Sequence, residues 1–109
     1  MASILNQFLP DSFHFTILQV EAFQNEDVGW TYNNTIPVGS MNLPSDAAIP
    51  TEFVQKLHEL GVLRPGADVS TDEDLFEAKR HALYVRDESD ILELCDGKTD
   101  EPLYAAVMA

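Results

Sequence analysis

The stretch Phe13–Phe23, with the sequence FHFTILQVEAF, carries the clearest structural signal in this chain of 109 residues. It is rich in aromatic and β-branched residues, which favour β-strands. In a strand, alternate residues share a face, so Phe13, Phe15 and Ile17 lie on one side and Leu18, Val20 and Ala22 on the other. A strand that is partly apolar on both faces is typical of the centre of a sheet. The pattern therefore predicts a central β-strand.

Four further segments have the composition of strands and are separated by polar or glycine-containing turns. The predicted strands are Val28–Val38, Ala82–Arg86, Ile91–Cys95 and Leu103–Val107. The first of these is expected to end at Pro37 and Gly39, because both residues interrupt strands. The last three are short, and the acidic turns between them predict hairpins.

Between these groups of strands, Pro50–Leu60 has the spacing of an amphipathic helix. Proline is tolerated in the first turn of a helix, and Gly61 supplies a stop. One face carries Phe53, Val54, Leu57 and Leu60. A second, short helix is expected to begin at Thr71 and continue to Arg80.

The organisation of the chain predicts one domain. Ser3–Leu9 is expected to form a short helix or an arm that caps the core. We therefore expect a single acidic α+β domain over residues 1–109, in which a small antiparallel β-sheet of four to five strands packs against one main α-helix.

The composition excludes several functional classes. Ile, Leu, Val and Phe make up 31 of the 109 residues, which favours a folded chain over a disordered one. The 19 acidic and six basic residues give a net charge of −13, which argues against direct binding to nucleic acid or to an anionic membrane. No apolar run approaches the ~18 residues that cross a bilayer, and the start of the chain lacks signal-peptide features. We expect a cytoplasmic protein.

No motif in the sequence predicts catalysis or metal binding. His14, His58 and His81 lie in three different predicted elements, without the spacing of a helical zinc site. Cys95, the single cysteine, stands beside Asp96, and a neighbouring carboxylate raises a thiol pKa, so a buried strand residue is the favoured interpretation. The acidic segments lack the glycine position of an EF-hand calcium loop. We therefore expect no enzyme activity, no cofactor and no metal; an enzyme or metal protein using acidic side chains with His81 is the least favoured alternative.

The distribution of charge is more informative than its total. Residues 68–109 hold 12 acidic and four basic residues, so most of the net charge lies in the shorter, C-terminal part. If the predicted turns converge, their carboxylates form one face that steers a basic partner. The candidate partner-binding residues are Asp72, Glu73, Asp74, Glu77, Asp87, Glu88, Asp90, Asp96, Asp100 and Glu101. The alternative is that these acidic turns only keep a small domain soluble.

Two stretches resemble small uncharacterised proteins encoded by bacteriophages. They are Gly29–Asn34, with the sequence GWTYNN, and Asp96–Ala105, in which the pattern is DxxTxxPLYA. A helix that begins at a proline and ends at a glycine, as at Pro50–Gly61, lies between them. The charged segment Thr71–Arg80 departs from this pattern. The resemblance implies a phage or mobile-element source and a helix-backed sheet, and it brings no catalytic residues.

Together these features predict a small acidic interaction protein. The favoured hypothesis is an anti-CRISPR or similar anti-defence inhibitor that blocks a basic, nucleic-acid-binding host protein in the host cytoplasm. In one form of this hypothesis the protein mimics nucleic acid. The alternative is a homo-oligomeric binding module or phage structural accessory held by apolar contacts, in which a homodimer uses Trp30, Tyr32 and Phe76 more than the acids.

Overall fold

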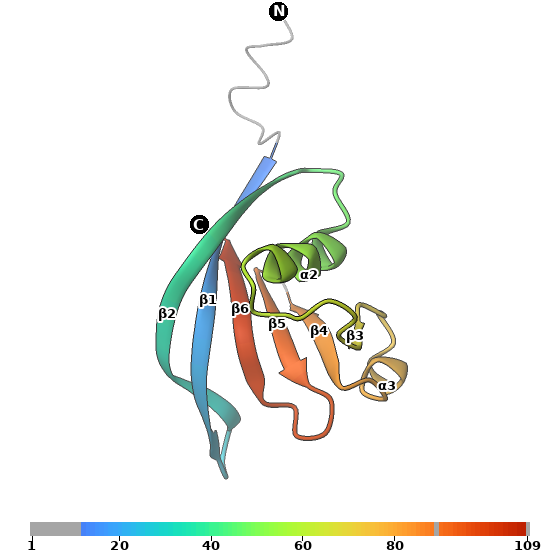
Figure 1. Ribbon diagram of the computed structural model, residues 1–109. Coiled ribbons are helices and arrows are strands. Elements are labelled where there is room, and N and C mark those ends of the chain that lie inside the picture. Colours follow the sequence, from blue (N-terminus) through green and yellow to red (C-terminus); the bar gives the residue numbers. More distant parts are fainter. Residues whose placement is uncertain (1–11, 89, 109) are drawn as a thin grey trace, which may run out of the picture.

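The structure, a computed structural model, describes residues 12–88 and 90–108. Figure 1 shows one bent sheet with a helix lying across one of its faces. In chain order the elements are β1 (Ser12–Asn25), β2 (Gly29–Pro44), α2 (Ile49–Glu59), β3 (Val69–Ser70), α3 (Leu75–Ala78), β4 (Leu83–Glu88), β5 (Ile91–Asp96) and β6 (Pro102–Met108). The helix or arm predicted at Ser3–Leu9 lies outside the described residues.

The sheet has six strands in the order β2-β1-β6-β5-β4-β3. The predicted central strand is confirmed, because β1 pairs with β2 on one side and with β6 on the other. The α+β class and the single main helix are also confirmed. The expected antiparallel sheet of four to five strands is corrected, since β3 adds a sixth strand that runs parallel to β4. A strand of two residues is too short to show the alternation by which strands are recognised in a sequence.

The main core lies between α2 and the face of the sheet that α2 covers (Figure 1). Phe53 and Leu57 of the helix are fully buried, as the helical spacing predicts. They meet side chains of β1, β2, β4, β5 and β6, and the buried cluster consists of Phe15, Ile17, Met41, Leu43, Phe53, Leu57, Leu63, Val85, Leu92, Leu94 and Ala106. Each large apolar side chain buried in this way contributes about 1.5–3 kcal/mol to folding.

The helix α2 begins and ends within one residue of its predicted bounds. Pro50 occupies the first turn, where its missing N–H leaves no bond unmade. Gly61 follows the helix with a φ of 80°, a left-handed conformation that glycine adopts without strain, and its N–H donates to the His58 carbonyl at 3.0 Å.

The strand β2 is longer than predicted, because it continues past Pro37 to Pro44. It forms an edge of the sheet, where one row of backbone groups has no strand partner among the described residues, so a proline removes no ladder bond on that side. The pairing with β1 also shifts register between Ile17 and Leu18, opposite Pro37 and Gly39. This bulge lets the strand continue through residues that were expected to end it.

The other face of the sheet is partly covered by α3. Ala78 of α3 packs with Tyr84 and Cys95 in a second buried cluster. The helix predicted from Thr71 to Arg80 is reduced to a single turn, because the residues before it form side-chain turns instead. The Asp74 side chain accepts a hydrogen bond from the Phe76 N–H at 3.0 Å, so the helix begins only after Asp74.

We predict that Gly97→Ala strongly destabilises the fold. A Cβ atom at Gly97, in the β5–β6 turn, would lie 1.9 Å from the His81 carbonyl oxygen, so the backbone would have to move. We expect the free energy of unfolding in urea to fall by about 2 kcal/mol or more. Gly39→Ala is the control, since its Cβ would meet only methyl groups of Leu60 at 3.0 Å. An equal loss in both variants would contradict the prediction.

Candidate functional site

The ten predicted partner-binding residues do not form one face. The β4–β5 turn, with Asp87, Glu88 and Asp90, lies at one end of the hairpin, and the β5–β6 turn lies at the other. A six-residue strand separates these ends by about 20 Å. The condition that all the acidic turns converge, which the sequence left open, is therefore not met. It fails because the two turns join opposite ends of the same strand, β5.

In the β5–β6 turn, the carboxylates of Asp96 and Asp100 accept hydrogen bonds from groups of the protein itself. Asp96 accepts hydrogen bonds from the N–H groups of Lys98 and Thr99, at 2.7 and 3.2 Å. Asp100 accepts from the Tyr84 hydroxyl at 2.8 Å and from the Lys79 ammonium at 3.2 Å. Desolvation opposes ionisation of Asp100, but these two donors outweigh it and hold the pKa of the carboxyl below its ordinary value.

Glu101, the remaining acid of that turn, and the acids Asp74 and Glu77 at α3 do not line the same cavity as Asp87 and Glu88. Glu101 lines a cavity of its own beside β1 and β2. Asp74 caps α3, and Glu77 pairs with Arg80 at 3.5 Å on the exposed side of the same helix. Exposed pairs of this kind contribute little to stability.

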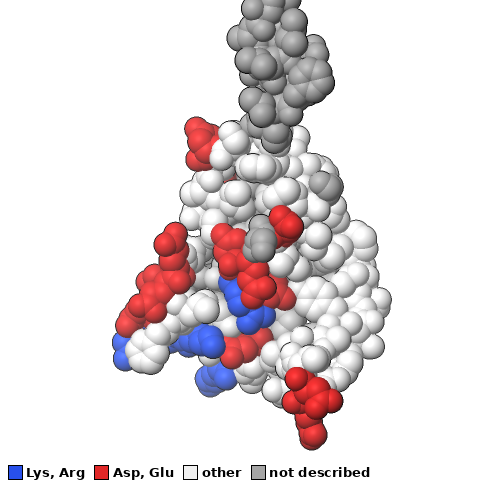
Figure 2. Space-filling view, turned by 180° about the vertical axis from the view of Figure 1, so that it is seen from behind, with Lys and Arg blue, Asp and Glu red and all other residues white. Residues whose placement is uncertain are grey.

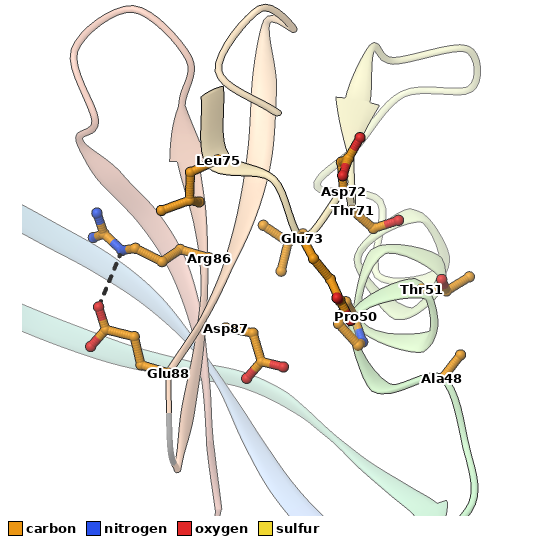
Figure 3. A pocket seen from close by; sticks show the side chains of 11 residues that line it. Ala48, Pro50, Thr51, Thr71, Asp72, Glu73, Leu75, Arg86, Asp87 and Glu88 are labelled. Atoms are coloured by element: carbon orange, nitrogen blue, oxygen red, sulfur yellow. Dashed lines mark ion pairs between the residues drawn. The ribbon is translucent and has the colours of Figure 1, made fainter. Parts of the chain in front are cut away.

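Four of the ten residues do converge. Asp72 and Glu73, from the loop between β3 and α3, line the same cleft as Asp87 and Glu88, from the end of β4. This acidic cleft has a volume of about 590 Å³. Figure 3 shows Asp87 and Glu73 on the side turned toward α2, and Arg86, Glu88 and Leu75 on the opposite side. The start of α2 closes the cleft through Ala48, Pro50 and Thr51.

The one basic side chain of the cleft, Arg86, is largely neutralised from within the protein. Its Nε and Nη2 atoms donate to Glu93 Oε1 at 2.9 and 2.7 Å, and its Nε lies 3.8 Å from Glu88. Desolvation disfavours the charged guanidinium, but the Glu93 carboxylate outweighs it and raises the pKa of Arg86 above its ordinary value. The positive charge of Arg86 therefore does not fully compensate the negative charge of the four carboxylates that line the cleft.

Sequence reasoning missed the polar network behind the cleft. Glu93 is only 8% exposed, and it also accepts a hydrogen bond from the Tyr32 hydroxyl of β2. Burial and this carboxylate raise the pKa of Tyr32, so the phenol stays protonated. Arg86 and Glu93 are direct partners across the β4–β5 hairpin. Opposite charges at matching positions of two predicted hairpin strands were the signal that could have revealed them.

The histidine and cysteine side chains lie outside the cleft. Cys95 is fully buried, and this burial raises the pKa of its thiol to about 12, which confirms the buried strand residue that was predicted. The His81 ring lies 2.5 Å from Asp68 on the surface, and this contact lowers the pKa of the Asp68 carboxyl. Within residues 12–88 and 90–108, no three His, Cys, Asp or Glu side chains lie close enough together to hold a metal ion.

Charge is distributed unevenly over the face of the sheet opposite α2. Figure 2 shows this face with charged side chains gathered over one part and a broad uncharged area over the other. The uncharged area lies over the strands β1 and β2, and β2 has no Asp, Glu, Lys or Arg in its 16 residues.

Comparison of the chain with protein-family models, curated proteins and solved structures gave no match. No helix in the part of the chain that the structure describes is long and apolar enough to cross a membrane.

We predict that Glu93→Gln destabilises the protein by about 2 kcal/mol, because a neutral amide leaves the half-buried Arg86 without its counter-charge. Unfolding in urea, followed by fluorescence, measures the change. Glu77→Gln is the matched control, since it breaks an exposed ion pair and should cost less than about 1 kcal/mol. If both variants lose the same stability, the network does not stabilise the fold as described.

Proposed function

We propose that this chain is a non-enzymatic binding protein whose acidic cleft takes a positively charged partner protein. The observation that carries the proposal is the convergence of Asp72 and Glu73 with Asp87 and Glu88 around one cavity. The two pairs come from segments that are not adjacent in the chain. The fold therefore brings the two pairs together. Charges that only keep a protein soluble do not need to be brought together in this way.

The sign of the charge indicates the class of partner. A cleft lined by carboxylates repels phosphates, so nucleic acids and anionic lipids are poor ligands. A protein with a Lys/Arg surface is attracted, and electrostatic steering accelerates such an association. Surfaces of this kind commonly bind nucleic acid. The proposed activity is therefore inhibition of a nucleic-acid-binding protein by occupying its basic surface, and an anti-CRISPR or other anti-defence inhibitor is its concrete form.

A capture experiment with neutralised variants tests the proposal. In the cleft variant, Asp72→Asn, Glu73→Gln, Asp87→Asn and Glu88→Gln remove four charges while keeping the shape of the side chains. In the control variant, four exposed acids elsewhere are neutralised: Glu26→Gln, Asp27→Asn, Asp46→Asn and Glu59→Gln.

We expect the wild-type protein and the control variant to capture basic, nucleic-acid-binding proteins from a bacterial lysate and to release them as NaCl is raised. The cleft variant should capture markedly less. Added duplex DNA should compete with the wild-type protein for the captured partner. Recovery that is the same for both variants, or that does not change with salt, would contradict a function of the cleft.

The uncharged edge of the sheet supports a second candidate function, a homodimer. In a chain of net charge −13, two copies repel one another least where no carboxylates lie. The edge strand β2 carries no charged residue, and its Ile36 is 52% exposed. Uncharged edge strands readily pair with another strand. Two β2 edges could thus join two sheets.

For this candidate we expect sedimentation velocity to show a dimer that persists in high salt, and Ile36→Lys to shift the protein to monomer. Val28→Lys is a suitable comparison, because it adds the same charge at an exposed residue that lies outside β2. A monomer at all protein concentrations would remove the homodimer and leave the function of the cleft untouched.

A further inference from the structure

The outer edge of β4 is open along the acidic cleft. β3 pairs only with Leu83 and Tyr84, and the chain then leaves the sheet through Thr71 and Asp72. Among the described residues, no strand pairs with the outer edge of β4 from Val85 to Glu88. These four residues line the cleft, and they span about 13 Å of strand. The cavity therefore lies where the next strand of the sheet would continue.

The backbone of β4 can accept such a strand. The Leu83 N–H donates outward, to the Asp68 carbonyl at 3.1 Å, and not toward β5. Backbone groups alternate sides along an antiparallel strand, so Val85 and Asp87 also direct their polar groups to the outer edge. The backbone N–H and carbonyl groups of the alternate residues point toward β5; these residues are Tyr84, Arg86 and Glu88. Beyond the reach of β3, Asp87 thus offers an N–H and a carbonyl toward the cleft.

The side chains around this edge favour basic residues on both faces of an added strand. Asp87 lies on the α2 side of the cleft together with Glu73, and Glu88 lies on the opposite side (Figure 3). Side chains of an extended peptide alternate between the same two sides. Leu75, which is 44% exposed, adds apolar contact area at the cleft.

We propose that the cleft binds an extended Lys/Arg-containing segment of another protein, which pairs with β4 as an additional edge strand. This inference rests on the proposed function and specifies how the partner is recognised. A second copy of this chain does not fit the site, because two cleft edges brought together would oppose eight carboxylates. Backbone pairing supplies affinity in this mode of recognition, and the flanking side chains supply selectivity.

Two synthetic peptides separate strand addition from simple charge attraction. The first is acetyl-VKKVKKV-amide, which places lysines on both faces when it is extended. The second has the same sequence with N-methyl groups on its valines, which lie on both backbone edges of the strand. N-methylation removes backbone N–H donors and leaves the charge unchanged. We expect the first peptide to bind and the second to bind at least about tenfold more weakly in calorimetry. The Asp87 amide should become protected from hydrogen exchange only with the first peptide.

Substitutions in the protein provide an independent check. Asp87→Pro removes both the N–H and the charge, and Asp87→Asn removes the charge alone, so binding of the first peptide should fall further in the proline variant. Far-ultraviolet circular dichroism establishes that both variants fold.

Equal binding of the two peptides, without protection of Asp87, would overturn strand addition while leaving the acidic cleft as a docking site. Failure of both peptides to bind would also overturn it. The proposed function itself fails only if the lysate capture is indifferent to neutralising the cleft, so the two results are distinguishable.

Discussion

The pairing of Arg86 with Glu93 is the interaction on which the rest of the site depends. It joins β4 to β5 on the face that α2 does not cover, and the Tyr32 hydroxyl extends it to the outermost strand on the other side of the sheet. Because Glu93 engages the guanidinium, Arg86 contributes little positive charge to the cleft. A buried ion pair gains little net stability over apolar packing but fixes one arrangement of its partners. Here that arrangement leaves the cleft acidic.

A sheet of this size has two faces to cover and only one long helix. The first face is closed by α2 through Phe53 and Leu57. The second is closed in pieces, by Ala78 of α3 over Tyr84 and Cys95, and by Tyr32 reaching Glu93 from the bent hairpin. The short segment around α3 thus serves two purposes. It covers the sheet, and its first residues form one wall of the cleft.

The sequence predicted the elements whose periodic patterns are long, and it missed those set by contacts between distant segments. Phe13–Phe23 and Pro50–Leu60 were placed correctly because apolar side chains repeat there with strand and helix periods. β3 has two residues and no period, and the extension of β2 past Pro37 depends on its place at an edge. The acidic residues were identified by type, but which of them meet is a consequence of strand order. Asp87 and Asp96 lie at opposite ends of the β4–β5 hairpin. Asp72 lines the same cavity as Asp87, because β3 ends early and the chain leaves the sheet there.

The single tryptophan of the chain is joined to the turn that anchors α3. The Trp30 indole N–H donates to the Thr99 carbonyl at 2.9 Å, and the next residue, Asp100, holds Lys79 at the end of α3. An indole is sensitive to the polarity of its surroundings, so its emission is an optical signal from this turn. The molecule thus carries an intrinsic fluorophore connected through a few polar contacts to the segment that walls the cleft.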